Sequence, residues 1–265
     1  MIKKVTEDEK RGPEFVTALE RGLNVLAAFG QAPRRMTLTQ VAELTDLSRG
    51  TARRFLLTLQ ALNYIDGDGK LFWLTPKVLQ FSNAYLTAFG LSEAGRSVIR
   101  RLTEHIGESS SMAVLDGHDV VYVARVETRR IFSSGIEVGS RLPAFCSSLG
   151  RVLLAGLDDA ELDGWLAEET FVAPSPRSIT DPQKVRQKVI EARRLQYAVI
   201  DGEMEVGVRS IAVPIQDRSG RTVAALNIGT TAARVSLDHM RKVFLPLLRE
   251  AAHEVERTMR DWAQP

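Results

Sequence analysis

Three arginines without acidic neighbours give the N-terminal part of the sequence its most distinctive chemistry. Arg49, Arg53 and Arg54 fall at helical spacing on one face, and no Asp or Glu occurs between Ser48 and Ile65. A guanidinium group can hydrogen-bond a guanine edge through two donors or clamp a phosphate, and the major groove of DNA admits one α-helix. The alternative is a solvated basic face of the kind found on many surface helices. The arginines alone do not decide between these interpretations.

A second group of polar residues stands before an apolar run in the middle of the chain. Ser147, Ser148 and Gly150 predict a loop that leads into the N-terminus of a helix. Free backbone amides at such a terminus attract a carboxylate, and a guanidinium from Arg141 or Arg125 could complete a clamp on an organic acid. Ordinary N-capping by one of the two serines explains the same pattern without a ligand. The residues by themselves favour the capping explanation.

The remaining reactive side chains give little sign of catalysis or metal binding. A catalytic thiol requires a nearby base and an electropositive setting, and no signature identifies a partner for Cys146, the single cysteine. We therefore interpret Cys146 as a buried structural residue. Metal-ligand spacing is absent from the four histidines, which are His105, His118, His239 and His253. We expect no metal site and no cofactor.

The elements around the three arginines predict a winged helix-turn-helix. Apolar residues recur at helical spacing in three segments, 14–29, 37–45 and 49–62, and Ser48 is placed to cap the third. Asp66-Gly67-Asp68-Gly69 predicts a tight hairpin turn before a strand at 70–74. This order of elements is that of a winged helix. It favours DNA binding over a solvated surface as the role of the arginines.

A different pattern follows residue 91 and predicts an α+β domain built on an antiparallel sheet. The expected domain bounds are an arm at 1–13, the winged helix at 14–75, a linker helix at 76–90 and the α+β domain at 91–265. Strands are expected at 110–115, 120–126, 131–138, 207–216 and 222–228. Helices are expected at 92–106, 147–157, 159–168, 182–196 and 236–262.

Composition excludes several broad classes of protein. The 265 residues are 44% hydrophobic and 26% charged, as in globular proteins, and no apolar run is long enough to span a bilayer. The first residues contain no apolar core of a secretory signal. Residues 1–90 carry twelve Lys/Arg against nine Asp/Glu, whereas the remainder carries 23 against 24. We expect a cytoplasmic protein without membrane contact and with a mildly basic N-terminal third.

Three stretches together resemble the IclR family of bacterial transcription regulators. They are VTALERGLNVLAAF, LTQVAELTDLSRGTARRFLLTLQALNYI and SRLPAFCSSLGRVLLAGL. Within that family the chain resembles the regulators of protocatechuate and 4-hydroxybenzoate catabolism, the β-ketoadipate pathway group. The resemblance implies a C-terminal effector domain on a six-stranded antiparallel sheet, and a homodimer or a dimer of dimers. Trp73 departs from the family, which often has a polar or basic residue at that position of the wing.

The residues and the resemblance together assign two sites. We expect contacts with double-stranded operator DNA from Ser48, Arg49, Thr51, Arg53, Arg54 and Lys70. The resemblance favours a second interpretation of the 141–151 segment, in which it forms an effector pocket for a small carboxylate and does more than cap a helix. The expected effector-binding residues are Arg125, Arg141, Cys146, Ser147, Ser148, Leu149, Ser210 and Asn227.

Three functions fit this organisation. The first is a DNA-binding, ligand-responsive transcription regulator. The second is an enzyme that acts on a small organic or aromatic acid through the C-terminal domain, which would require an acid/base or nucleophile pair that these residues do not supply. The third is an architectural DNA-binding protein without a ligand, for which the large C-terminal domain would be unnecessary. The first explains both candidate sites.

Overall fold

The computed structural model describes residues 12, 14–30, 35–88, 93–128 and 135–258. The chain divides into two compact units, Met1–Tyr85 and Leu86–Pro265. The expected arm at 1–13 lies outside the described residues apart from Gly12. The finer bounds, with a separate linker helix at 76–90, stay a prediction. In the described ranges no helix combines the length and the apolar character needed to cross a membrane.

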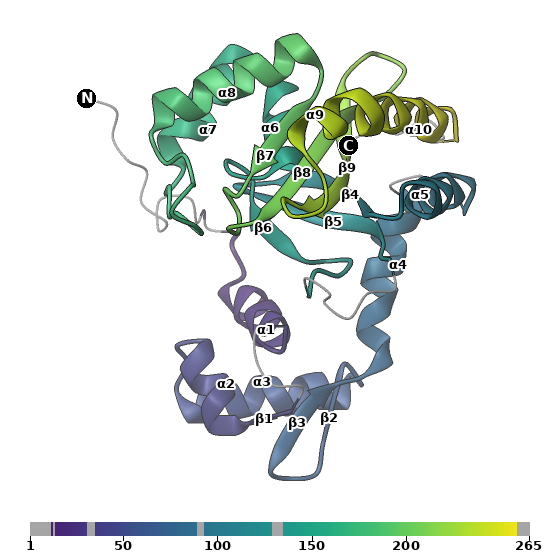
Figure 1. Cartoon of the computed structure of the whole chain (residues 1–265). Helices are drawn as coiled ribbons and strands as arrows, with labels where there is room; N and C mark the ends of the chain where they lie inside the picture. The colour runs from purple at the N-terminus through teal and green to yellow at the C-terminus, as the bar shows by residue number, and fades with distance from the viewer. Residues whose placement is uncertain (1–11, 13, 31–34, 89–92, 129–134, 259–265) are drawn as a thin grey trace. The chain divides into compact units, whose positions relative to one another are not determined.

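The N-terminal unit has the helices and hairpin of a winged helix-turn-helix (Figure 1). Its described elements are α1 (Thr17–Ala28), β1 (Met36–Thr37), α2 (Leu38–Leu44), α3 (Arg49–Ala61), β2 (Ile65–Gly67), β3 (Leu71–Leu74), the 3-10 turn Pro76–Val78 and the larger part of α4 (Leu79–Ala88), whose residues from Leu86 on belong to the second unit. The start of α2 is fixed by a capping box, in which the side chains of Thr37 and Gln40 each bond the other's backbone amide. Val25, Met36, Leu56 and Ile65 form the buried centre of the unit.

The wing of this unit is a small antiparallel sheet in the order β1-β3-β2. Ile65 pairs with Leu74 and Gly67 with Phe72. Asp68 shapes the turn, because its carboxylate accepts hydrogen bonds from the amides of Lys70 and Leu71. A hairpin turn is present but spans residues 68–70, because Asp66 and Gly67 of the expected turn belong to β2. Strand β1 adds a third strand that the sequence did not indicate.

The C-terminal unit is built on a six-stranded antiparallel sheet in the order β6-β5-β4-β9-β8-β7. Its strands are β4 (Ser109–Asp116), β5 (Asp119–Val126), β6 (Arg141–Pro143), β7 (Ala198–Asp201), β8 (Val208–Gln216) and β9 (Thr222–Thr231). Strands β4, β9 and β8 form the long centre of the sheet and carry alternating residues into two separate cores. This arrangement confirms the α+β class.

Helices cover the sheet on both faces (Figure 1). Helices α5 (Glu93–Ile106) and α10 (Leu245–Thr258) pack on one face, with Ile99, Leu248 and Val255 buried between them and the strands. Helices α6 (Ser148–Ala155), α7 (Asp159–Glu168) and α8 (Pro182–Leu195) cover the other face. Buried Leu149, Leu154 and Val189 belong to that second core.

Three expectations about the C-terminal elements need correction. Residues 135–138 form no strand, and 129–134 lie outside the described residues; the edge strand is instead β6. Strand β7 was not expected, since four residues between polar neighbours give little periodicity. The last helix is not one regular helix, because α9 (Leu237–His239) passes through the π-helical segment Met240–Phe244 before α10 begins.

Candidate functional site

Five of the six expected DNA-contacting residues lie at the start or on the outer side of α3, and Lys70 lies at the wing turn. The Ser48 hydroxyl accepts a hydrogen bond from the Thr51 amide at 3.2 Å and caps the helix. Ala52, Leu56 and Leu59 are buried on the inner face. The opposite face presents Arg49, Arg53 and Arg54, all exposed and without an ion pair to any described residue, and Lys70 is exposed at the wing turn. Three unpaired guanidinium groups on one helix remain available to an anionic partner.

A cavity of about 700 Å³ lies in the C-terminal unit, against the sheet and the start of α6. Six of the eight expected effector residues line it: Arg125, Ser147, Ser148, Leu149, Ser210 and Asn227. They come from β5, α6, β8 and β9, so strand pairing brings together positions up to about a hundred residues apart. The remaining wall is largely apolar and includes Ile136, Leu142, Ile200, Met204 and Val208.

Three polar side chains in the cavity wall lack hydrogen-bond partners. Ser148 Oγ, Asn227 Oδ1 and Thr230 Oγ1 are buried, and none has a partner within the described part of the chain. Ser148 is only 1% exposed. A buried polar atom without a partner costs about 1–3 kcal/mol, and native proteins retain few of them. Their concentration in one cavity marks a site prepared for a polar ligand.

The start of α6 adds backbone donors to these side chains. Ser147 caps the helix by accepting from the Gly150 amide at 2.9 Å. The amides of Ser148 and Leu149, the first two of the helix, make no hydrogen bond to the described residues. A Cβ at Gly150 would collide with the backbone of Ala144, so only glycine permits this approach of helix and loop. Capping and ligand binding are therefore compatible, because Ser147 caps while Ser148 stays free.

The cations of the cavity wall are each held by a carboxylate. Arg125 pairs with Glu127 at 2.8 Å and donates to Ser111 Oγ at 3.0 Å, and its side chain is 12% exposed. Arg234 pairs with the buried Glu108 at 3.0 Å. Each of these positive charges is balanced by the carboxylate beside it. The two ion pairs therefore place polar groups at the cavity wall but add little net charge to it.

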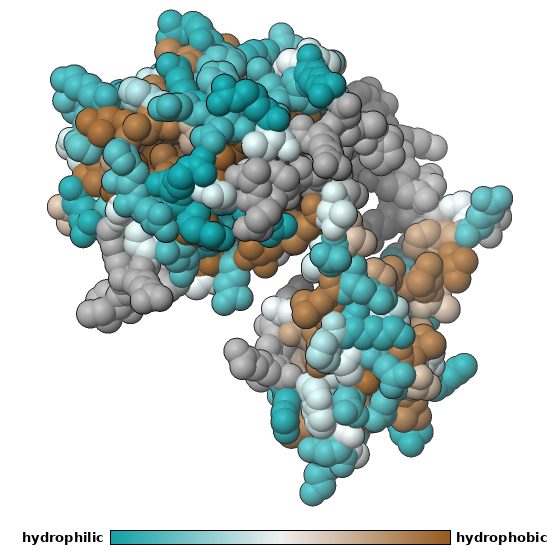
Figure 2. Space-filling view, turned by 90° about the vertical axis from the view of Figure 1, so that its right-hand side faces the viewer, coloured by the Kyte–Doolittle hydropathy of each residue, from teal (hydrophilic) through white to brown (hydrophobic). Residues whose placement is uncertain are grey.

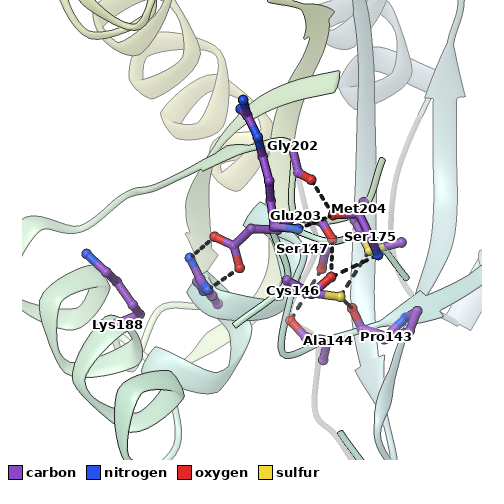
Figure 3. A network of polar contacts seen from close by, with 12 residues as sticks. Pro143, Ala144, Cys146, Ser147, Ser175, Lys188, Gly202, Glu203 and Met204 are labelled. Atoms are coloured by element: carbon purple, nitrogen blue, oxygen red, sulfur yellow. Dashed lines mark hydrogen bonds and ion pairs between the residues drawn. The ribbon is translucent and has the colours of Figure 1, made fainter. Parts of the chain in front are cut away.

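A buried ion pair fixes the segment that closes one side of the cavity (Figure 3). Arg151 on α6 donates two hydrogen bonds to Glu203, at 2.9 and 2.6 Å, and both side chains are buried. Ser175 Oγ donates to the Gly202 carbonyl at 2.6 Å, and Ser178 Oγ donates to the Glu203 carbonyl at 2.6 Å. These contacts position Met204, the next residue, in the wall.

Two expected effector residues do not line the cavity. Arg141 lies on the edge strand β6, where it pairs with Asp116 at 2.6 Å and with Asp119 at 3.0 Å. These carboxylates raise the pKa of Arg141 and hold its side chain at the turn between β4 and β5. Cys146 is fully buried behind the wall, with its Sγ 3.2 Å from Met204 Sδ. Of the two arginines considered as a carboxylate clamp, Arg125 lines the cavity and Arg141 does not.

Several residues of the cavity wall were not predicted from the sequence. Tyr122, Thr230 and Met204 line the cavity, as do Glu108 and Arg234. Burial raises the pKa of Tyr122 to about 12, against a smaller lowering by Arg125, so its phenol stays protonated and able to donate. The alternation of side chains along a strand predicts that Gly229 and Thr231 lie on the same face as Asn227. No local sequence pattern indicates that β9 pairs with β4.

The described residues contain no group of three or more His, Cys, Asp or Glu side chains placed to hold a metal ion. The Cys146 thiol has a pKa raised to about 12, first by burial and then by the charge of Glu203. A thiol with this pKa is protonated near neutral pH and is a poor nucleophile.

Comparisons with known proteins give a consistent result over the chain. The family model described as IclR helix-turn-helix domain matches residues 18–69, and the model described as bacterial transcriptional regulator IclR C-terminal matches residues 83–257. The Pca regulon regulatory protein of Pseudomonas putida is 39% identical over 244 residues, which cover 92% of this chain and 84% of that protein.

Two solved structures extend the comparison. A Rhodococcus sp. RHA1 protein classed as a candidate transcriptional regulator is 44% identical, with a TM-score of 0.82 over 92% of this chain and 98% of that one. The inducer binding domain of an Acinetobacter PobR double mutant, in complex with 3-hydroxybenzoic acid, is 33% identical. Its TM-score is 0.59, over 63% of this chain and 98% of that one.

The buried thiol yields a prediction about chemical reactivity. Cys146 is the single cysteine, so one thiol reagent reports on it alone. Because its pKa is raised in the folded chain, we expect labelling by a disulfide reagent at pH 8 to be at least about 100-fold slower than in the chain unfolded by guanidinium.

The same shift has a defined effect on stability. An unfolded thiol ionises near pH 8.5, whereas the folded thiol stays neutral up to about pH 12. Its contribution to stability is complete below about pH 8.5 and decreases as the pH rises above that value. Equal labelling rates in the folded and unfolded chains would contradict the assignment of Cys146 as buried and protonated.

Proposed function

The chain belongs to the IclR family of bacterial transcriptional regulators. We propose that it binds operator DNA through α3 and responds to a small carboxylate, aromatic or from the β-ketoadipate pathway, held in the C-terminal cavity. The family and the relatives of aromatic-acid pathways make it a transcription regulator and not an enzyme. The proposal concerns the residues that bind DNA, the residues that bind the effector, and the chemical class of that effector.

The DNA-binding part of the proposal is supported by the exposed face of α3. Arg49, Thr51 and Arg53 occupy positions from which side chains can reach base edges in a major groove. Arg54 and Lys70 are better suited to phosphates, since they flank that face. No described carboxylate neutralises these arginines, so the attraction to a polyanion is undiminished.

The single observation that carries the ligand assignment is the set of unpartnered polar atoms in a mostly apolar cavity. A carboxylate accepts hydrogen bonds, and Ser148 Oγ with the free amides of Ser148 and Leu149 can donate them. Asn227, Thr230 and the protonated Tyr122 phenol suit a ring hydroxyl. The apolar wall suits an aromatic ring. The 3-hydroxybenzoic acid in the PobR domain is a ligand of this chemical class.

We propose further that the chain acts as a homodimer or a dimer of dimers. Helix α1 exposes Leu19 and Leu23, and α4 exposes Phe81, with exposed fractions of 62%, 55% and 57%. Figure 2 shows apolar surface in brown on the N-terminal unit. Apolar side chains at helical spacing are costly to leave in water. A two-fold axis would cover them and would set two recognition helices at half-sites about 34 Å apart or at a multiple of that distance.

The DNA contact of α3 can be tested by truncation. Replacing Arg53 by Ala should cost about 1–3 kcal/mol of operator affinity and relax sequence preference at one position if the guanidinium reads a base. The measurement is a fluorescence-anisotropy titration on a duplex selected from a random library by the wild-type protein. Unchanged affinity and preference for both Arg53→Ala and Arg49→Ala would remove α3 from the recognition role.

The ligand assignment can be tested by filling the cavity at Ser148. We expect calorimetry on the wild-type protein to detect 4-hydroxybenzoate, protocatechuate or β-ketoadipate binding more tightly than acetate. Ser148→Leu should abolish that binding, because the larger side chain occupies the space and removes a donor. The matched variant Ser148→Ala removes the hydroxyl alone and should weaken binding about 5- to 10-fold.

Both Ser148 variants should keep wild-type affinity for the selected operator. Ser148→Leu should lose the response to the acid, and Ser148→Ala should need about 5- to 10-fold more acid for the same response, which separates a ligand defect from a folding defect. Retention of full binding by Ser148→Leu would place the ligand elsewhere. No binding of any of the three acids above the level of acetate would show the ligand class to be wrong.

A further inference from the structure

The wing sheet has an outer face that carries a cation from another part of the chain. Met36 and Ile65 point inward and are buried, and Phe72 and Leu74 pack on the same core. Side chains alternate across a strand, so Trp73 stands on the opposite face. Its strand partner there is Asp66 on β2. On its other side lies Arg35, the residue before β1, which pairs with β3.

The guanidinium of Arg35 lies over the ring of Trp73. Its Cζ is 4.5 Å from the ring centroid, well within cation–π distance. Arg35 is exposed and Trp73 is half-buried. No ion pair joins Arg35 to a carboxylate of the described residues. The pKa of Asp68 in the neighbouring turn is lowered, first by hydrogen bonds from the amides of Leu71 and Lys70 and last by the charge of Arg35.

A guanidinium held in this way is well suited to a phosphate. The aromatic ring covers one face of the planar group and leaves its N–H edges free to donate in pairs. The stacking also restricts the side chain before any partner arrives, so less conformational entropy is lost on binding. Trp73 itself has no charge to offer, and Arg35 supplies a positive charge at the position that Trp73 leaves neutral.

The place of the pair in the fold connects it to the DNA surface. Three residues separate the end of α3 from the start of β2, and the hairpin projects from the body of the N-terminal unit (Figure 1). A duplex that receives α3 in its major groove presents phosphates on both sides of that groove. A cation on the adjoining hairpin is therefore directed at the sugar–phosphate backbone.

We propose that Arg35 contacts a DNA phosphate and that Trp73 is the positioning residue that holds its guanidinium for this contact. The inference rests on the proposed DNA-binding function of α3. A purely structural alternative exists, in which the stacked pair only fastens β1 to β3. The two differ in a measurable quantity, because a phosphate contact contributes to the salt dependence of DNA binding and a structural fastening does not.

The experiment measures operator affinity against salt concentration for Arg35→Ala in the full chain, on the duplex selected by the wild-type protein. Each phosphate contact contributes about 0.9 to the slope of log K against log salt. Arg35→Ala should lower the slope by about that amount per bound subunit and weaken binding about 8-fold per contact at 0.1 M salt. Arg35→Lys, which keeps the charge, should restore the slope.

Trp73→Leu tests the positioning role. The variant keeps Arg35 and its charge, so the slope should stay near the wild-type value while affinity falls by less than for Arg35→Ala. In the Trp73→Leu background, removal of Arg35 should cost less than in the wild type, as expected of coupled residues. Thermal unfolding of each variant reports on any loss of stability.

The matched control is Arg194→Ala, which removes an exposed arginine from α8 of the other unit. An Arg35→Ala variant with the affinity and slope of this control would overturn the proposal, as would a lowered melting temperature with an unchanged slope. Arg53→Ala separates this result from the proposed function. If it weakens binding while Arg35→Ala does not, α3 binds DNA and only the role of Arg35 is wrong.

Discussion

The buried ion pair between Arg151 and Glu203 is the contact on which the wall of the C-terminal cavity depends. It joins the first turns of α6 to the segment after β7, across 52 residues of sequence. Taking two charges out of water is costly, and removing one partner of such a pair typically destabilises a protein by about 3–5 kcal/mol. The two hydrogen bonds between the guanidinium and the carboxylate offset this desolvation cost only when the two groups keep their relative position. The pair therefore restricts the positions of α6 and Met204 relative to each other.

The first backbone amides of α6 have no hydrogen-bond partner within the helix, as at the start of any α-helix. The ion pair also restricts the movement of α6 towards another partner. Gly150 brings the helix against the Ala144 backbone, and Ser147 caps it, while Ser148 Oγ and the first two amides have no partner among the described residues. A carboxylate bound at this point, as proposed above, would accept hydrogen bonds from these unpartnered donors. Such binding would be a differential interaction of the kind that allows a ligand to shift an equilibrium between conformations. Coupling of about 1–3 kcal/mol changes affinity at a second site 5- to 150-fold.

The sequence predicted what depends on local pattern and missed what depends on distant pairing. The wing turn, the cap at Ser48 and the loop at Ser147 are each encoded within a few residues. The position of Arg141 outside the cavity was not predicted, because its partners, Asp116 and Asp119, lie in a turn more than twenty residues earlier. Thr230 and Met204 were missed because the register of β9 on β4 and the course of the chain after β7 have no local signature. Six of eight expected effector residues nevertheless line one cavity, because the resemblance supplied the pairings that periodicity could not.

The most direct test is a crystal structure of the protein with the acid that binds it most tightly. We expect the carboxylate to lie within about 3 Å of Ser148 Oγ and of the Leu149 amide, with the ring against Met204 and the Arg151–Glu203 pair intact. Hydrogen bonds from the ligand to Asn227 or Thr230 would complete the set of unpartnered atoms. A ligand seated outside this cavity, or one whose carboxylate avoids the start of α6 while Ser148 stays unpaired, would contradict this expectation.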